Sequence, residues 1–416
     1  MTDSINLASI IEKQLPAELV NFMRVAGEVT ANQEQSLYLV GGVVRDLLLG
    51  RANLDLDLVV EGDAMNVAQQ LLQIYQGKIT THLHFRTANL QWNKWSIDLA
   101  TARSETYTKP GALPSVKPSS MDKDLFRRDF TINAMAIKLN PSHYGELIDL
   151  YGGRDDLENK LIRVLYERSF IDDATRIWRG LRYEQRLNFQ LEPNTFKLLK
   201  RDIPMLDTIS GDRVRCELEL ILKEAYPEIV LRRAEELGVL PKLHPSLRGS
   251  RCLAEQFEQA RQLSSLGSPP VGLYLALMAY PLTNEENEHL ISYLRLPKSL
   301  CLILRDTIGI KAKLQLLAKP ELTPSSIYHL LHGYSSLSVT ANSLISDSPV
   351  ARQHLQLFLS KLRYVKPTLT GNDLQKMGIA PSPQMKEILN LLHESRLDRK
   401  VTSKQGEVNL VKEWLD

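Results

Sequence analysis

Strand-like segments are confined to the first 148 residues of this chain. Short apolar or alternating runs at 37–40, 54–60, 78–85 and 95–100 are typical of strands. From Asp149 onward the strand signals fade, and the spacing of apolar residues is typical of packed helices up to the end of the chain. The pattern therefore predicts an α+β head followed by an all-helical arm.

Length and composition are those of a folded protein with several domains. The chain has 416 residues, a formal net charge of +2 and 43% hydrophobic residues, which excludes a disordered or collagen-like chain. Its three cysteines lie far apart, and its first residues lack the pattern of a secretion signal. No apolar run is long enough to span a bilayer, so we expect a cytoplasmic protein with no membrane partner.

Three local patterns give sharper expectations. The first 30 or so residues predict a helix with Leu15, Leu19 and Phe22 on one face. Asp63 precedes a helical pattern that runs to Tyr75, which makes it a candidate N-cap. The segment 104–120 is rich in Pro, Gly and Ser and predicts a long loop, and loops of that length inside a domain are often functional.

Two carboxylates lie close together in an apolar strand pattern. Asp55 and Asp57 alternate with leucines, so both side chains are expected on the same face of the strand. Paired carboxylates in apolar surroundings are costly unless a cation lies between them, and Mg²⁺ is the natural ion for oxygen ligands. Two such ions can hold the attacking and leaving oxygens of a phosphoryl displacement. We therefore expect Asp55 and Asp57 to be catalytic metal ligands.

A glycine pair precedes this strand. Gly41 and Gly42 end the strand 37–40 and begin a helix, so their backbone amides can approach a triphosphate closely, next to Arg45 and Asp46. Asp98, on another apolar strand, is either a third catalytic carboxylate or a structural residue paired with Arg103.

Two arginine-rich clusters follow. The first holds Arg127, Arg128, Asp129 and Asn133: its arginines can bind triphosphate oxygens and its asparagine a sugar hydroxyl, or the group is a structural ion-pair network. The second is a helical stripe of Arg176, Arg179, Arg182 and Arg186, which favours phosphate or base recognition over a mere solvated face.

Asp173 and Arg176 together offer a way of choosing a base. Cytosine and adenine both present an amine donor beside a ring-nitrogen acceptor, whereas uracil and guanine present the inverse pattern. A carboxylate that accepts from the amine and a guanidinium that donates to the ring nitrogen would select C and A without a template.

These motifs resemble those of class II tRNA nucleotidyltransferases and bacterial poly(A) polymerases, in the DNA polymerase beta superfamily. The shared segments include 41–46, 55–57, 127–134, 149–157, 173–182, 213–217 and 369–379. The resemblance implies a polymerase-beta-like head with a mixed sheet (1–148), a nucleotide-selecting neck (149–225), a body (226–365) and a tail (366–416). It also implies that body and tail bind the acceptor and T arms of tRNA, and that CTP, ATP or both are substrates.

Two departures from the family bear on which nucleotides are added. Asp172 stands where the family often has Glu, and segment 105–116 is similar to the form common in A-adding and CC-adding members. These features favour partial synthesis of the CCA end, with A-addition slightly ahead of CC-addition. The alternatives are a complete CCA-adding enzyme, a poly(A) polymerase, and an inactive RNA-binding paralogue; the last is disfavoured because Asp55 and Asp57 are intact.

Overall fold

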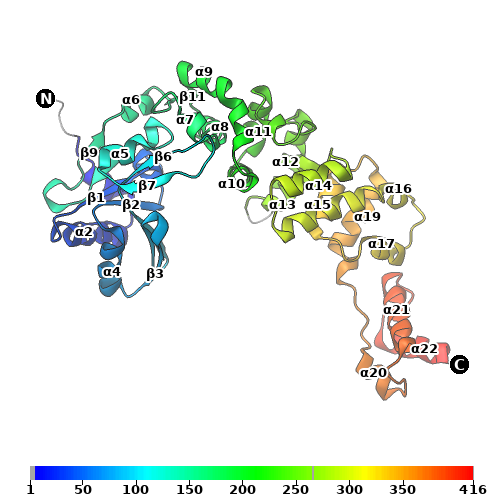
Figure 1. Ribbon diagram of the computed structural model, residues 1–416. Helices are drawn as coiled ribbons and strands as arrows, with labels where there is room; N and C mark the ends of the chain where they lie inside the picture. Colours follow the sequence, from blue (N-terminus) through cyan, green and yellow to red (C-terminus); the bar gives the residue numbers. More distant parts are fainter. Residues whose placement is uncertain (1–4, 265–266, 416) are drawn as a thin grey trace. The chain divides into compact units, whose positions relative to one another are not determined.

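The structure of the protein is a computed structural model that describes residues 5–264 and 267–415. The chain divides into two compact units, Met1–Glu217 and Leu218–Asp416. The first unit contains a mixed sheet with helices and the second is helical, which confirms the expected fold class (Figure 1). The four-part division into head, neck, body and tail remains a prediction.

Within the described residues, the largest sheet has seven strands. In spatial order they are β3 (Lys78–His82), β4 (Thr87–Trp92), β5 (Trp95–Thr101), β2 (Leu56–Glu61), β1 (Ser36–Val40), β8 (Met135–Lys138) and β9 (Leu147–Asp149). β2 and β5 run parallel, and the other neighbouring strands are antiparallel.

The helices of the first unit cover both faces of this sheet and continue beyond it. They are α1 (Ala8–Gln14), α2 (Ala17–Ala31), α3 (Gly42–Leu48), α4 (Ala64–Tyr75), α5 (Met121–Phe126), α6 (Gly153–Glu158), α7 (Ser169–Asp172), α8 (Thr175–Leu187), α9 (Pro193–Asp202) and α10 (Gly211–Leu222), the last of which runs past the boundary at Glu217. A short parallel pair, β10 (Leu161–Ile162) and β11 (Gln190–Leu191), interrupts the region that was expected to be wholly helical.

The alternation of side chains along β1 and β2 decides which face of the sheet carries the acidic residues. Tyr38, Val40 and Val59 pack with α5 on one face, while α2 and α4 lie on the other (Figure 1). Asp57 pairs with Val40 across the strands and lies two residues from Val59, so it shares their face.

The N-terminal helix is broken in two, contrary to the single helix expected. Leu15 is extended, with φ −100° and ψ 148°, because the residue before a proline is disfavoured in the α region. Pro16 then caps α2, so the chain turns between the two helices while Leu15 and Leu19 stay buried. Asp63, in contrast, caps α4 as expected and accepts hydrogen bonds from the amides of Met65 and Asn66.

The segment expected to be a long loop is a β-hairpin. β6 (Arg103–Thr106) pairs with β7 (Ser115–Pro118), which leaves only 107–114 as a connection. Proline content hid these strands: Pro118 stands at the end of β7, where a missing amide hydrogen is tolerated.

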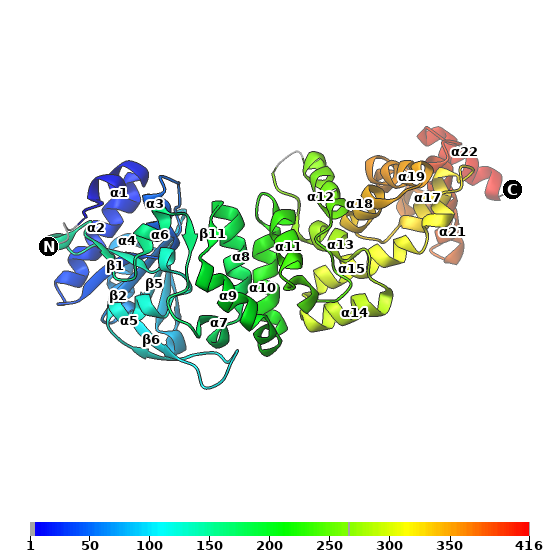
Figure 2. The same ribbon diagram turned by 90° about the horizontal axis from the view of Figure 1, so that it is seen from above.

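The second unit is built from stacked helices. They are α11 (Pro227–Glu236), α12 (Arg251–Leu263), α13 (Val271–Ala279), α14 (Asn284–Tyr293), α15 (Lys298–Lys311), α16 (Leu314–Leu317), α17 (Pro324–Leu331), α18 (Ser336–Ile345), α19 (Pro349–Ser360), α20 (Gly371–Lys376), α21 (Pro383–Leu397) and α22 (Lys404–Leu415). α18 packs against α13, α15 and α19 (Figure 2). Among the described residues, none of the helices has the length and apolar character needed to cross a bilayer.

Gly27 offers a test of how tightly α2 packs on the sheet. A Cβ at this position would lie 2.1 Å from the carbonyl oxygen of Leu139, which belongs to the backbone and cannot rotate away. We expect Gly27→Ala to lower the free energy of unfolding by about 1–3 kcal/mol, despite the gain in helix propensity. Urea titration followed by circular dichroism measures the change, with the exposed neighbour Glu28→Ala as control. A Gly27→Ala protein as stable as the control would contradict this packing.

Candidate active site

One cavity of about 630 Å³ in the first unit brings together residues from distant parts of the sequence. Fourteen of its lining residues carry a formal charge: Arg45, Asp55, Asp57, Arg103, Glu105, Arg127, Arg128, Asp129, Asp173, Arg176, Arg179, Arg186, Arg213 and Glu217. Gly41, Gly42 and Asn133 complete the expected set that is found here. Asp46, Asp98 and Arg182 are expected site residues that do not line it.

The glycine turn between β1 and α3 lies next to the acidic residues. Gly41 has φ +77°, a conformation that favours glycine, and a Cβ there would lie 3.4 Å from Asp57 Oδ2 and 3.2 Å from Arg128 Nη1. The small residue thus allows the backbone, a carboxylate and a guanidinium to approach one another.

Asp55 and Asp57 form the acidic part of the cavity. Asp57 lies within β2, whereas Asp55 immediately precedes the strand and is exposed, so the expectation that both belong to the strand is wrong for Asp55. Burial raises the pKa of Asp57 to about 6, and the negative charges of Asp55 and Asp98 add to this effect against the opposing charge of Arg128. Ionised Asp57 is therefore held at a cost that a cation would relieve.

The two carboxylates suit a divalent cation that takes its other ligands from elsewhere. In residues 5–264 and 267–415 no group of three or more His, Cys, Asp or Glu side chains is arranged to hold a metal. Mg²⁺ is commonly held by one or two carboxylates together with water and substrate phosphates, rather than by a cage made only of protein ligands. Two carboxylates without further protein ligands therefore fit Mg²⁺.

Asp98 lies beside Asp57 but outside the cavity. The two are register partners in the parallel pair β2–β5, and Asp98 is exposed and accepts a hydrogen bond of 2.7 Å from Asn89 Nδ2. The expected alternative, a pair with Arg103, is wrong: Arg103 donates to Glu105 at 3.2 Å and to the carbonyl oxygen of Phe85 at 3.3 Å.

Asp129 joins the first arginine cluster to the second. Its Oδ1 accepts from Asn133 Nδ2 at 3.0 Å, and its Oδ2 accepts from Arg179 Nη2 at 2.6 Å. Asn133 in turn accepts from Arg45 Nη1 at 2.8 Å, and Arg45 also pairs with Asp46. Although burial opposes ionisation, Arg179 and Asn133 lower the pKa of Asp129 to about 2, so it is a carboxylate at neutral pH.

Arg127 and Arg128 are held by one buried carboxylate. Asp124 accepts from Arg127 at 2.8 Å and from Arg128 at 3.1 Å, and these charges lower its pKa despite complete burial. Each arginine keeps part of its side chain at the cavity surface, at 18% and 15% exposure. The ion-pair network expected for this cluster is therefore present, and because both arginines also line the cavity, triphosphate binding by them stays a prediction.

The arginine stripe of α8 is a solvated face only at Arg186, which is exposed, whereas Arg179 is partly buried. Arg176 and Arg182 are buried, and Arg182 pairs with Glu217 at 3.6 Å. Arg176 donates to Ser169 Oγ at 2.6 Å and to the carbonyl oxygen of Arg127 at 2.6 Å. Asp173, at the end of α7, brings its carboxylate to the same cavity.

Sequence comparison finds proteins that are similar to this chain along nearly its whole length. A family model described as the poly A polymerase head domain matches residues 37–163, and one described as a probable RNA and SrmB-binding site of polymerase A matches residues 188–249. The A-adding tRNA nucleotidyltransferase of Halalkalibacterium halodurans is 34% identical over 99% of this chain and 96% of its own length. This chain belongs to the tRNA nucleotidyltransferase family.

Other relatives of the family agree in sequence and in fold. The A-adding tRNA nucleotidyltransferase of Geobacter sulfurreducens is 32% identical over 96% of this chain, which spans 48% of that longer protein. The solved structure of a CCA-adding enzyme in apo form II superposes with a TM-score of 0.81, at 32% identity, covering 99% of this chain and 100% of that one. The Thermotoga maritima CCA-adding enzyme complexed with tRNA_CCA gives a TM-score of 0.76 at 30% identity, covering both chains fully, at 100%.

Several residues of this tRNA nucleotidyltransferase's cavity were not expected from physical reasoning on the sequence. Glu105, in β6, and Tyr107, which directly follows it, lie in the segment that was expected to be a loop, and their spacing of two residues was the available signal. Arg213 and Glu217 were marked only by the family resemblance. Tyr183 lies one turn after Arg179, and its ring stacks within 4.9–5.7 Å of three guanidinium groups, those of Arg45, Arg179 and Arg182.

The raised pKa of Asp57 makes a prediction about stability. Without divalent metal at a pH of about 8, we expect Asp57→Asn to raise the free energy of unfolding by about 1–3 kcal/mol, because the ionised carboxylate is the disfavoured form in the folded protein. As the pH falls through about 6, folded wild-type protein takes up a proton before its unfolded chain does, which stabilises it. The difference in free energy of unfolding between the variant and the wild type, the gap, therefore narrows. Below the unfolded value, near 4, the gap should vanish. Urea titrations across this pH range measure it, and a variant less stable than wild type at high pH would contradict the account.

Proposed function

We propose that this protein transfers AMP from ATP to the 3′ end of a tRNA that already ends in CC. The observation that carries the transfer reaction is the single cavity that joins the carboxylate pair Asp55 and Asp57 to the base-reading pair Asp173 and Arg176. A nucleotide bound there would have its triphosphate and its base within reach of different residues of one site.

The metal is proposed to be Mg²⁺, held by Asp55 and Asp57 and by the triphosphate. When bound, it would supply the positive charge that stabilises the attacking and leaving oxygens of the displacement. Asp98 is proposed to act from beside Asp57, where its charge helps to attract the cation.

Other residues of the cavity are proposed to bind the nucleotide. The backbone at Gly41 and Gly42 and the side chains of Arg127, Arg128 and Arg179 would bind phosphate oxygens, because planar guanidinium groups match that geometry. Asp46 and Arg182 do not line the cavity and would act through residues that do, since Asp46 orients Arg45 and Arg182 pairs with Glu217. Asn133, which accepts from Arg45, would orient that arginine and offer its amide to the sugar.

Selection of the base is assigned to Asp173 and Arg176. The carboxylate would accept from the exocyclic amine of adenine, and the guanidinium would donate to its ring nitrogen. The choice of A over CC rests on relatives: three A-adding enzymes match 82–99% of this chain, while the CC-adding enzyme of Deinococcus radiodurans matches 47%.

The helical second unit is proposed to bind the acceptor and T arms of tRNA. The Thermotoga maritima CCA-adding enzyme, solved with tRNA_CCA, resembles this chain over its full length, including these helices. We retain the division into neck (149–225), body (226–365) and tail (366–416), and a cytoplasmic location, as parts of the same proposal.

Loss of either carboxylate tests the catalytic assignment. We expect Asp55→Ala and Asp57→Ala to reduce AMP incorporation by at least about a thousandfold, since positioned charge supplies most of the rate in such reactions. Asp122→Ala, which removes an exposed carboxylate elsewhere in the head, is the matched control. Near-normal turnover in either folded variant would refute the assignment.

The nucleotide and the end point are tested on three transcripts, one without CCA, one ending in C and one ending in CC. With Mg²⁺, CTP and ATP, we expect a single A on the CC-ended transcript and no extension of the other two. Two C residues and a stop would make the enzyme CC-adding, and full restoration would make it CCA-adding. A continuing A-tail would indicate a poly(A) polymerase, and no incorporation anywhere would indicate an inactive RNA-binding paralogue.

A further inference from the structure

A buried tyrosine forms part of the cavity wall. Tyr183, on α8, lines the cavity although only 8% of its surface is exposed. The rings of Tyr183 and Phe130 are nearly perpendicular, with their centroids 6.0 Å apart and an angle of 89° between the planes. Gly180 leaves room for this contact, since a Cβ there would lie 3.1 Å from Phe130 Cζ. Packing of this kind limits the ring of Tyr183 to one orientation.

Three guanidinium groups surround this ring. Their central carbons lie 4.9 Å (Arg182), 5.2 Å (Arg45) and 5.7 Å (Arg179) from the ring centroid. The hydroxyl of Tyr183 also accepts from Arg179 Nη2 at 3.3 Å. Arg45 belongs to α3 and the other two arginines to α8, so the ring links two elements that are distant in the sequence. A cation within about 6 Å of a ring centroid is attracted by the negative face of the ring.

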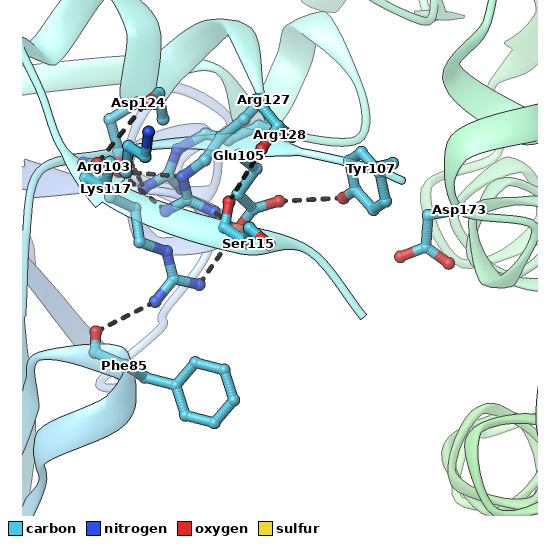
Figure 3. Close-up of polar contacts among 12 residues, drawn as sticks. Phe85, Arg103, Glu105, Tyr107, Ser115, Lys117, Asp124, Arg127, Arg128 and Asp173 are labelled. Carbon is cyan, nitrogen blue, oxygen red and sulfur yellow. Dashed lines mark hydrogen bonds and ion pairs between the residues drawn. The ribbon is translucent and has the colours of Figure 1, made fainter. Parts of the chain in front are cut away.

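A ring and a carboxylate hold a cation in different ways. Elsewhere in the cavity a carboxylate does so, since Asp124 pairs with both Arg127 and Arg128 (Figure 3). A carboxylate brings a full negative charge, which lowers the positive potential that a triphosphate meets. An aromatic ring has no net charge, so its quadrupole attracts guanidinium groups and leaves their charge available. Tyr183 can therefore hold several arginines close together without lowering the positive potential of the cavity.

We propose that Tyr183 is a positioning residue for the triphosphate, whose ring holds Arg45 and Arg179 at the cavity surface where the phosphate oxygens bind. This inference rests on the proposed function of the cavity as a nucleotide site. Tyr183 acts through the two arginines that line the cavity with it, whereas Arg182 is buried and does not line it.

Loss of the ring is expected to weaken binding of the phosphates. In Tyr183→Leu we expect the KM for ATP to rise by about tenfold, because two guanidinium groups lose their attraction to the ring. The inhibition constant of pyrophosphate, a product that carries the phosphates alone, should rise by the same factor. Tyr183→Phe keeps the ring, so both constants should stay within about threefold of wild type. The KM for the CC-ended transcript should keep its wild-type value, since these arginines are assigned to the nucleotide.

Fluorination of the ring separates its electrostatic effect from its packing. Fluorine atoms draw electron density from the face of a ring and weaken its attraction for cations, while the shape of the side chain changes little. We expect a ring-trifluorinated phenylalanine at position 183 to raise both constants above those of Tyr183→Phe, towards those of Tyr183→Leu. This variant keeps the packing against Phe130, so it tests the proposal even if Tyr183→Leu does not fold.

Tyr144→Leu is the matched control. The ring of Tyr144 lies 4.7 Å from the central carbon of Arg24 in the same unit, and Tyr144 does not line the cavity, so both constants should equal those of wild type. Equal constants for Tyr183→Phe and the trifluorinated protein would overturn the proposal, as would a folded Tyr183→Leu protein with a lower kcat and unchanged constants. If wild type itself incorporates nothing, the proposed function fails, whereas an active wild type with either of these results sinks only this inference.

Discussion

The carboxylate of Asp129 is the contact on which the cavity depends. It accepts from the amide of Phe130 and from Asn133 on one oxygen, and twice from Arg179 on the other. Through Asn133 it reaches Arg45 of α3, and through Arg179 it reaches α8. A single buried charge thus fixes the direction of two arginines from elements far apart in the sequence. Breaking a buried pair of this kind leaves an uncompensated charge, so its main effect is to specify one arrangement rather than to add stability.

The same principle explains how so many arginines can share one cavity. Four of them are held at their inner side by a buried or half-buried acid: Arg127 and Arg128 by Asp124, Arg179 by Asp129 and Glu217, and Arg213 by Asp173. The acids neutralise the arginines without withdrawing them from the cavity surface. A triphosphate would therefore meet donors that are already oriented, so little reorganisation is needed on binding.

The sequence predicts best those features that local chemistry decides. The cap by Asp63 and the glycine turn at Gly41 follow from short-range rules, and the structure confirms both. Asp55 and Asp57 line one cavity, although Asp55 precedes the strand on which the expected shared face depended. The stripe on α8 was periodic in the sequence, but its burial was not visible there, because the acids that allow it, Asp129 and Glu217, come from other segments. The hairpin was hidden for a similar reason: β6 is stabilised by its pairing with β7, which its own residues do not reveal, and the Pro and Gly content of the segment is typical of a loop.

Reading a base with side chains instead of a template places a demand on rigidity. A complementary base in a duplex is held by stacking and by its backbone, whereas a lone carboxylate on a short turn can rotate and accept from many donors. Asp173 follows a four-residue helix in an extended conformation, so the local backbone gives it little support. The support comes from Thr175 on one oxygen and Arg213 on the other, and Arg176 is fixed by Ser169 and the carbonyl oxygen of Arg127. Selectivity of this kind resides less in the two reading side chains than in the contacts that limit where they can point.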